Sequence, residues 1–242
     1  MSEMNLEHGH SPEEIAARLS ATNKPAYIRD MIFGGIDGAV TTFAVVAGVA
    51  GASLSAKIVL ILGIANLVAD GFSMAAGNYS GTKADHDRVA QLRQLEERHL
   101  DLHPDGEREE VRQILASKGI TGPALEASVE AITSDRERWI GLMLTEEYGL
   151  ATIFPHPLRA ALATFLAFIV CGSIPLLPYL TDNTDPFPVA VVVTAIVFFV
   201  IGTVKSRWAL MPWWLSGLET LFIGAAAAGL AYFIGWLLGG LV

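Results

Sequence analysis

Five long apolar runs, separated by polar links, dominate the pattern of hydrophobic and polar positions along the chain. A transmembrane helix needs about 20 apolar residues, because each residue rises about 1.5 Å and the hydrocarbon core of a bilayer is ~30 Å thick. The sequence therefore predicts an all-α integral membrane protein with five transmembrane helices. The runs cover residues 28–54, 58–80, 158–180, 189–204 and 213–238.

The polar stretch between the second and third runs has the pattern of a helical insert. It is interrupted at the segments LHPDG, KGITGP and TSD, whose glycine, proline and aspartate residues are typical of turns. We expect the second transmembrane helix to continue into the insert, followed by helices near 107–117, 123–132 and 135–150. The predicted parts are an N-terminal tail (1–26), transmembrane helices 1 and 2 (27–82), the insert (83–152) and transmembrane helices 3 to 5 (153–242).

Lysine and arginine are distributed unevenly among the polar links. They are concentrated in the tail, in the insert and in the link between the fourth and fifth runs, which holds Lys205 and Arg207. The link between the third and fourth runs has none, and the link between the first and second runs has only Lys57. Positively charged links stay in the cytoplasm, so we expect the N-terminus and the insert to be cytoplasmic.

Composition narrows the class of protein further. Hydrophobic residues make up 52% of the chain and the mean hydropathy is +0.45, as expected for a membrane protein. A net charge of −9 argues against nucleic acid as a partner. Cys171 is the only cysteine, which excludes an intrachain disulfide and a cysteine-based zinc site. The chain has no P-loop, so ATP-driven pumping is not supported, and the first 25 residues lack the apolar segment of a cleavable signal peptide.

The second apolar run carries Asn66, Asp70 and Met74 at spacings of four. Residues four apart lie on the same side of a helix, so the three side chains form one stripe. A carboxylate in the middle of a membrane costs roughly 2.5–3.5 kcal/mol on insertion scales. An amide oxygen, a carboxylate and a thioether can together coordinate a divalent transition metal. A buried polar cluster that joins helices is the alternative explanation.

Two further acids lie in apolar runs. Asp37 stands between Gly34 and Gly38 in the first run, and the spacing of these glycines lets another helix backbone approach closely. Because a short link makes the first two runs a hairpin, Asp37 can meet the stripe of the second run at similar depth. Glu219 in the fifth run is a candidate proton carrier, with an interfacial or helix-packing role as the alternative.

The insert is rich in glutamate. Glu107 and Glu110 are three residues apart and Met143 and Glu147 four apart, so each pair shares a helix face. Glu96, His99 and His103 also fall near one face. These residues are candidate metal ligands, although acidic side chains that alternate with arginines are often simply solvated.

The segments RDMIFGGIDGAVTTFAVVAGVAGA and GIANLVADGFSMAAGNYSGTKA, followed by the glutamate-rich insert and three more apolar runs, resemble the vacuolar iron transporter family over about residues 27–242. The resemblance implies a homodimer of five-helix subunits. It also implies export of ferrous iron, and often manganese, from the cytosol in exchange for protons. The first two helices of each subunit would line the path at the dimer interface.

The resemblance also implies roles for individual residues. Asp37 and Met74 match the family's membrane aspartate and methionine. Asn66 stands where plant members carry a glutamate, so we expect Asp70, one turn further on, to carry the proton that an amide cannot. Gln94 stands where they carry the first glutamate of the insert, and the sequence is closer to bacterial members. The family's cytoplasmic metal ligands match Glu97, Glu107, Glu110, Met143 and Glu147.

These observations predict a proton-coupled transporter that exports divalent transition metal from the cytosol and is not an enzyme. The predicted substrates are ferrous iron and, further, manganese or cobalt, and no cofactor is expected to be bound permanently. The predicted metal ligands in the membrane are Asp37, Asn66, Asp70 and Met74, and the predicted proton carriers are Asp37, Asp70 and Glu219. We expect a bacterial inner membrane, or a vacuolar membrane in a eukaryote.

Two other classes of function remain open at this point. The first is a membrane-anchored protein that binds or senses iron in the insert without transporting it. The second is an intramembrane hydrolase in which Asp37 and Asp70 form a paired-carboxylate dyad.

Overall fold

The structure is a computed structural model that describes residues 9–20, 27–151, 154–181 and 184–240. Most of the predicted tail and the predicted boundary at 152–153 lie outside these ranges. The described chain is helical and contains no strand within these ranges. Its elements are α1 (Pro12–Ser20), α2 (Ile28–Gly51), α3 (Ala56–Leu102), α4 (Pro104–Ser117), α5 (Pro123–Thr133), α6 (Arg136–Glu146), α7 (Pro157–Ser173), η1 (Ile174–Leu180), α8 (Pro186–Lys205), η2 (Ser206–Trp208) and α9 (Trp213–Gly239).

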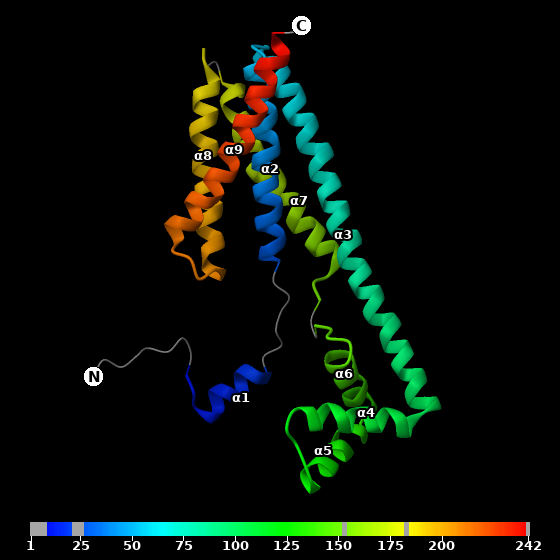
Figure 1. Ribbon diagram of the computed structural model, residues 1–242. Coiled ribbons are helices and arrows are strands. Elements are labelled where there is room, and N and C mark those ends of the chain that lie inside the picture. The colour runs from blue at the N-terminus through cyan, green and yellow to red at the C-terminus, as the bar shows by residue number, and fades with distance from the viewer. Residues whose placement is uncertain (1–8, 21–26, 152–153, 182–183, 241–242) are drawn as a thin grey trace, which may run out of the picture.

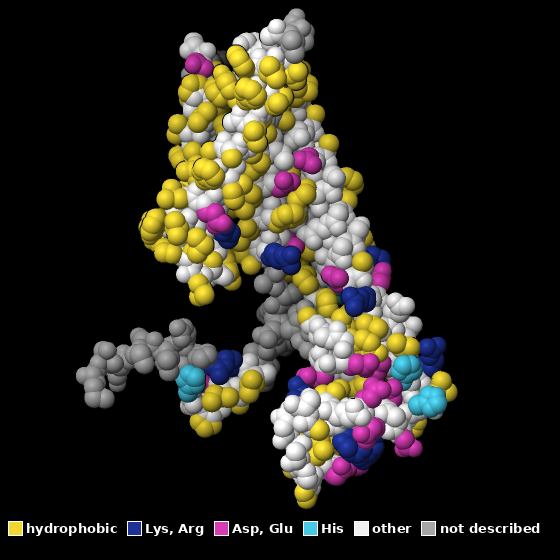
Figure 2. Space-filling view, viewed as in Figure 1, with side chains coloured by type: hydrophobic (Ala, Val, Ile, Leu, Met, Phe, Trp, Pro, Cys, Tyr) yellow, Lys and Arg dark blue, Asp and Glu magenta, His cyan; other side chains and the backbone are white. Residues whose placement is uncertain are grey.

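Five helical segments of the described chain are long and apolar enough to cross a membrane, which confirms the predicted fold class. We call the membrane bundle the set formed by α2, the first half of α3, α7 with η1, α8 and α9 (Figure 1). Figure 2 shows mainly hydrophobic side chains on this part of the surface, whereas charged side chains and histidines gather on the insert. An apolar outer surface is what lipid requires of a spanning bundle.

Most predicted helix ends agree with the structure to within three residues. Helix α6 ends at Glu146 rather than at residue 150, and the other larger difference lies near prolines. The third predicted helix continues to residue 180, but the α-helix ends at Ser173 and the chain goes on as the 3₁₀ helix η1. Pro175 and Pro178 lie in this segment, and proline lacks the N–H that an α-helix needs and clashes with the preceding turn. Helix α8 begins at Pro186, earlier than predicted, because proline is well tolerated at the first helical position.

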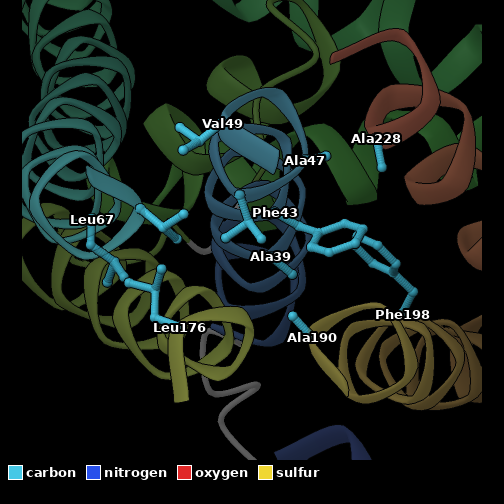
Figure 3. Close-up of a cluster of buried hydrophobic side chains, with 11 residues drawn as sticks. Ala39, Phe43, Ala47, Val49, Leu67, Leu176, Ala190, Phe198 and Ala228 are labelled. Atoms are coloured by element: carbon cyan, nitrogen blue, oxygen red, sulfur yellow. The ribbon is translucent and has the colours of Figure 1, made fainter. Parts of the chain in front are cut away.

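Helix α2 lies at the centre of the membrane bundle. Half of its apolar window is buried, compared with 11% for α9. Figure 3 shows Phe43 of α2 beside Phe198 of α8 and Ala228 of α9. On the other side of α2, Leu67 of α3 lies against Leu176 of η1. Because α2 contacts all the other spanning segments, its packing fixes the arrangement of the bundle.

Glycines allow α2 to approach α7 closely. A Cβ atom added at Gly34 would lie 2.3 Å from the carbonyl oxygen of Thr164, and one at Gly38 would lie 2.3 Å from that of Phe168. Near the other end of α2, a Cβ at Gly51 would lie 2.3 Å from the carbonyl oxygen of Tyr232 in α9. The close approach that the sequence predicted therefore joins helices within one chain.

The insert is built on the second half of α3. This helix has 47 residues and is therefore about 70 Å long, so it extends well beyond a ~30 Å hydrocarbon core. Helices α4 and α6 pack against its far end, and α5 packs against both of them (Figure 1). They enclose a second hydrophobic core of buried side chains, formed by Leu100, Val111, Leu115, Val129, Trp139, Ile140 and Met143.

We expect Gly38→Ala to destabilise the protein by about 1–3 kcal/mol, the usual cost of overpacking. Its methyl group cannot be accommodated without moving α2 away from α7. The measurement is the thermal unfolding midpoint of the purified protein in detergent micelles. Gly81→Ala in α3 is the matched control, because its Cβ meets no atom within 4 Å. An equal midpoint for Gly38→Ala and the control would contradict the proposed packing constraint.

Candidate metal centre

Two buried glutamates form the centre of the insert. Glu96 on α3 is fully buried, and Glu107 in the first turns of α4 is only 5% exposed. The hydroxyl of Tyr148 donates a hydrogen bond of 2.8 Å to Oε1 of Glu96. The Oε2 atoms of both glutamates are buried and have no hydrogen-bond partner among the described residues. Buried carboxylate oxygens without partners are costly, so a cation between them would stabilise this arrangement.

His99 completes a group that is compact enough for one metal ion. It lies on α3 three residues after Glu96, and its Nδ1 atom is 3.2 Å from Oε1 of Glu107 and 3.9 Å from Oε1 of Glu96. One potential ligand atom from each of the three residues lies within 4.8 Å of the others. We call Glu96, His99 and Glu107 the insert cluster.

The insert cluster lies in a field of negative charge. The pKa of Glu107 is raised to about 7, chiefly by burial and also by the nearby carboxylates of Glu96, Glu110 and Glu147, whereas His99 opposes the shift. Burial and the charge of Glu96 also raise the pKa of Glu147. Carboxyl groups that lie next to one another resist ionisation, because their negative charges repel. A divalent cation offsets this repulsion and stabilises the ionised forms.

The structure brings most of the predicted insert residues to this place. Glu107 belongs to the cluster, and Glu110 and Glu147 are exposed residues that interact with it electrostatically. Met143 is fully buried in the core of the insert.

Glu97 is placed elsewhere, because its carboxylate accepts a 3.0 Å hydrogen bond from Nε of Arg93. Glu96, rather than Glu97, occupies the buried position.

A sequence signal for Glu96 existed. Leu92 precedes it by four residues and Leu100 follows it by four, so Glu96 shares a helix face with two leucines. Leu100 is buried in the insert core. Glu97 is rotated by about 100° from that face, which directs it toward solvent and Arg93.

Inside the membrane bundle, the structure places the two predicted aspartates in one region. Asp37 of α2 and Asp70 of α3 are partly buried and close enough to interact electrostatically. The side-chain amide of Asn66 on α3 donates a 3.4 Å hydrogen bond to the hydroxyl of Thr41 on α2. Met74 is partly buried one turn beyond Asp70. The stripe on α3 therefore lies along the side of that helix where α2 is packed.

A second polar cluster in the bundle was not predicted. The amide of Asn78 on α3 donates hydrogen bonds to Oδ1 of Asp30 on α2 (2.9 Å) and to the hydroxyl of Thr164 on α7 (2.6 Å). The hydroxyl of Thr82 donates in turn to Oδ1 of Asn78 at 3.2 Å. The signal was the spacing, since Asn78 lies four residues beyond Met74 and continues the predicted stripe.

Glu219 lies apart from these clusters. Its Oε2 atom on α9 is 2.8 Å from Nζ of Lys205 at the end of α8, and its side chain is 46% exposed. This ion pair joins two neighbouring helices and supports the helix-packing alternative for Glu219.

The fold defines a helical membrane protein with five candidate spanning segments in the described chain and a polar helical insert, whose insert cluster is compact enough for one metal ion. The model of the VIT family matches residues 28–236, and the chain belongs to this family, as the sequence predicted.

Several named relatives are similar over most of the chain. Vacuolar iron transporter 1 of Arabidopsis thaliana is 35% identical over 210 residues, which cover 85% of this chain and 83% of the relative. Vacuolar iron transporter 2 of Oryza sativa subsp. japonica is 34% identical over 212 residues, with 85% of each chain covered. The vacuolar iron transporter of Toxoplasma gondii is 32% identical over 224 residues, which cover 88% of this chain and 74% of the relative.

We expect the metal-free insert to lose stability as pH rises. The neutral carboxyl of Glu107 is favoured by folding, since its pKa is raised from 4.5 to about 7. Its contribution to stability is therefore fully present below about pH 4.5 and is lost as pH rises through about 7. The measurement is hydrogen exchange of α4 in the full-length protein with a chelator present, corrected for the intrinsic effect of pH on exchange.

Glu107→Gln keeps the side chain neutral and should weaken this pH dependence and increase protection of α4 at pH 8. Glu126→Gln is the control, because Glu126 is exposed, is paired with Arg112 and has a lowered pKa. That variant should follow the native protein above about pH 5, where both states of Glu126 are ionised. A Glu107→Gln variant with an unchanged pH dependence would show that Glu107 is not the responsible group.

Proposed function

We propose that this protein transports ferrous iron out of the cytosol in exchange for protons, and that the insert lies on the cytoplasmic side. Membership of the VIT family and the names of the relatives support iron as the substrate. The observation that carries the proposal is the placement of two acidic sites along one helix. Helix α3 bears Asp70 beside Asp37 inside the membrane bundle and Glu96 in the insert cluster outside it.

The first step of the proposed mechanism is capture. The insert carries more acidic than basic charge around the cluster, which raises the local concentration of divalent cations. Glu96 and Glu107 would bind the ion with their unpartnered oxygens, and Glu110 and Glu147 would attract it. Binding displaces protons because a coordinating carboxyl must be ionised.

The second step is passage through the bundle. The ion would move to Asp37 and Asp70, with the oxygen of Asn66 and the thioether of Met74 as further ligands. A set that combines carboxylate and thioether favours ferrous iron, manganese or cobalt over magnesium and calcium, which prefer oxygen alone. Asp37 and Asp70 would release protons when the ion binds and take up protons when it leaves, which couples the two flows. The proposed assembly is a homodimer whose path runs between subunits.

We expect Asp37→Asn to abolish proton flux driven by a ferrous ion gradient in proteoliposomes, because an amide cannot exchange a proton with the ion. The measurement uses a pH-sensitive dye inside the vesicles and a metal-sensitive dye in a parallel sample. Asp85→Asn is the matched control, since Asp85 lies on the same helix α3 as Asp70 but is exposed in the insert region. Native exchange in Asp37→Asn would remove this residue from the mechanism.

The same assay separates transport from the alternative of a membrane-anchored iron-binding protein. Such a protein would bind iron in the insert without moving it across the vesicle membrane. Metal binding without flux in native protein would therefore refute the proposed transport function.

We expect Glu107→Gln to raise the iron concentration for half-maximal flux by at least about tenfold, because even the loss of an outer-shell partner of a metal ligand costs about 10–100-fold in affinity. The maximal flux should stay near the native value, because the insert captures the ion and the bundle moves it. The measurement is initial flux against iron concentration, with Glu126→Gln as control. An unchanged half-maximal concentration would exclude the insert cluster from capture.

A further inference from the structure

The insert cluster differs from an all-oxygen site in one respect. Its third member is an imidazole, and Nδ1 of His99 faces both carboxylates, at 3.2 Å from Glu107 and 3.9 Å from Glu96. The carboxylate side chains are only 6% and 1% exposed in these pairs. Their Oε2 atoms are buried without partners in the described chain. These orphaned oxygens are a second observation, independent of the clustering itself, that points to a cation.

The imidazole can present a lone pair to that cation when the cation replaces the proton that Nδ1 directs at Oε1 of Glu107, 3.2 Å away. Its side chain is 40% exposed, so Nε2 can carry the proton and bond to water while Nδ1 faces the cluster. A histidine ligand needs such an arrangement, since the second nitrogen must be able to donate its proton to another group. His99 also lies on the same rigid helix as Glu96, which fixes the spacing between the nitrogen and the first carboxylate.

A nitrogen donor changes which ions the site prefers. Imidazole suits iron, nickel, copper and zinc, whereas carboxylates, carbonyls and water suit manganese, magnesium and calcium. Cobalt binds nitrogen ligands more tightly than manganese, as the Irving–Williams order requires. Imidazole is also neutral. A third carboxylate in its place would attract more strongly an ion that is held chiefly by charge. At this position a histidine therefore favours the later transition metals over manganese.

We propose that His99 is a direct metal ligand that sets the selectivity of the insert, so that the insert binds borderline transition ions in preference to manganese. This proposal rests on the proposed function for the role of the insert in capture. It goes further, because it assigns the discrimination between substrate ions to one atom of the insert cluster, the Nδ1 nitrogen of His99.

The test compares the binding of Co²⁺, an air-stable substitute for ferrous iron, with that of Mn²⁺ to the full-length protein in detergent micelles. His99→Gln should weaken Co²⁺ binding at the insert by about tenfold or more, since even the loss of an outer-shell partner costs about 10–100-fold in affinity. The affinity for Mn²⁺ should change much less. His99→Glu should raise Mn²⁺ affinity relative to Co²⁺, because it replaces the nitrogen by a charged oxygen ligand. His103→Gln is the matched control, since His103 ends the same helix but is exposed.

A spectroscopic readout separates a ligand from a residue that only positions the carboxylates. Co²⁺ bound to Nδ1 of an imidazole shifts the proton on Nε2 far outside the normal NMR range. We expect such a solvent-exchangeable resonance in native protein and in His103→Gln, and its loss in His99→Gln.

Two outcomes would overturn the proposal. One is a loss of Co²⁺ and Mn²⁺ affinity in equal proportion in His99→Gln, and the other is persistence of the shifted resonance in that variant. Both readouts measure binding without transport. A protein with His99-dependent selectivity but no flux would refute the proposed transport and keep this inference, whereas flux without any effect of His99 would refute this inference alone.

Discussion

The free-energy cost of holding carboxylates away from water is the constraint on which the rest of this structure depends. A buried anion is stabilised only by an opposite charge or by hydrogen bonds, and otherwise its pKa rises until it becomes neutral. Glu96 and Glu107 show both responses, since Glu96 accepts a hydrogen bond from Tyr148 and the pKa of Glu107 is raised to about 7. Neither response provides a partner for their Oε2 atoms. In the proposed mechanism, a divalent ion would provide this partner during capture and would then be released to the bundle.

Helix α3 connects the two places where this constraint operates. It is unbroken over 47 residues, so the acids in its membrane half and those in the insert belong to one rigid element. The chain that returns from the insert is also attached to the bundle. Nε2 of His86 on α3 donates a 2.8 Å hydrogen bond to the carbonyl oxygen of Pro155, and the backbone N–H of His156 donates to the hydroxyl of Tyr27 at 3.2 Å. The segment that precedes α7 is therefore hydrogen-bonded both to α3 and to Tyr27, the residue before α2.

The bundle in turn depends on α2, whose glycines bring it against α7 and α9. This close packing places Asp37 opposite α3, and the hydrogen bonds of Asn78 to Asp30 and Thr164 join α2, α3 and α7 near the same region. Small residues and polar contacts of this kind are what hold helices together where lipid removes the hydrophobic driving force. The same glycines that fix the fold thus fix the position of an acid that takes part in the proposed transport.

The sequence by itself determined the number of spanning segments, their approximate ends and the helical character of the insert. These features follow from local composition, because a run of about 20 apolar residues must be helical in lipid and because proline and glycine mark helix ends locally. The motif GGIDG and the stripe on α3 also singled out Asp37 and Asp70 as candidate ligands and proton carriers.

Only the tertiary structure decided which glutamate of the adjacent pair is buried and that His99 faces Glu107. These contacts join residues of α3, α4 and the segment after α6, and their geometry depends on how three helices pack around a shared core. Helix periodicity placed Glu96 on the same face of α3 as two leucines. That face is buried because helices from elsewhere in the chain pack against it. Such long-range packing has no local signature in the sequence, and for this reason the chemistry of the insert cluster emerged from the fold.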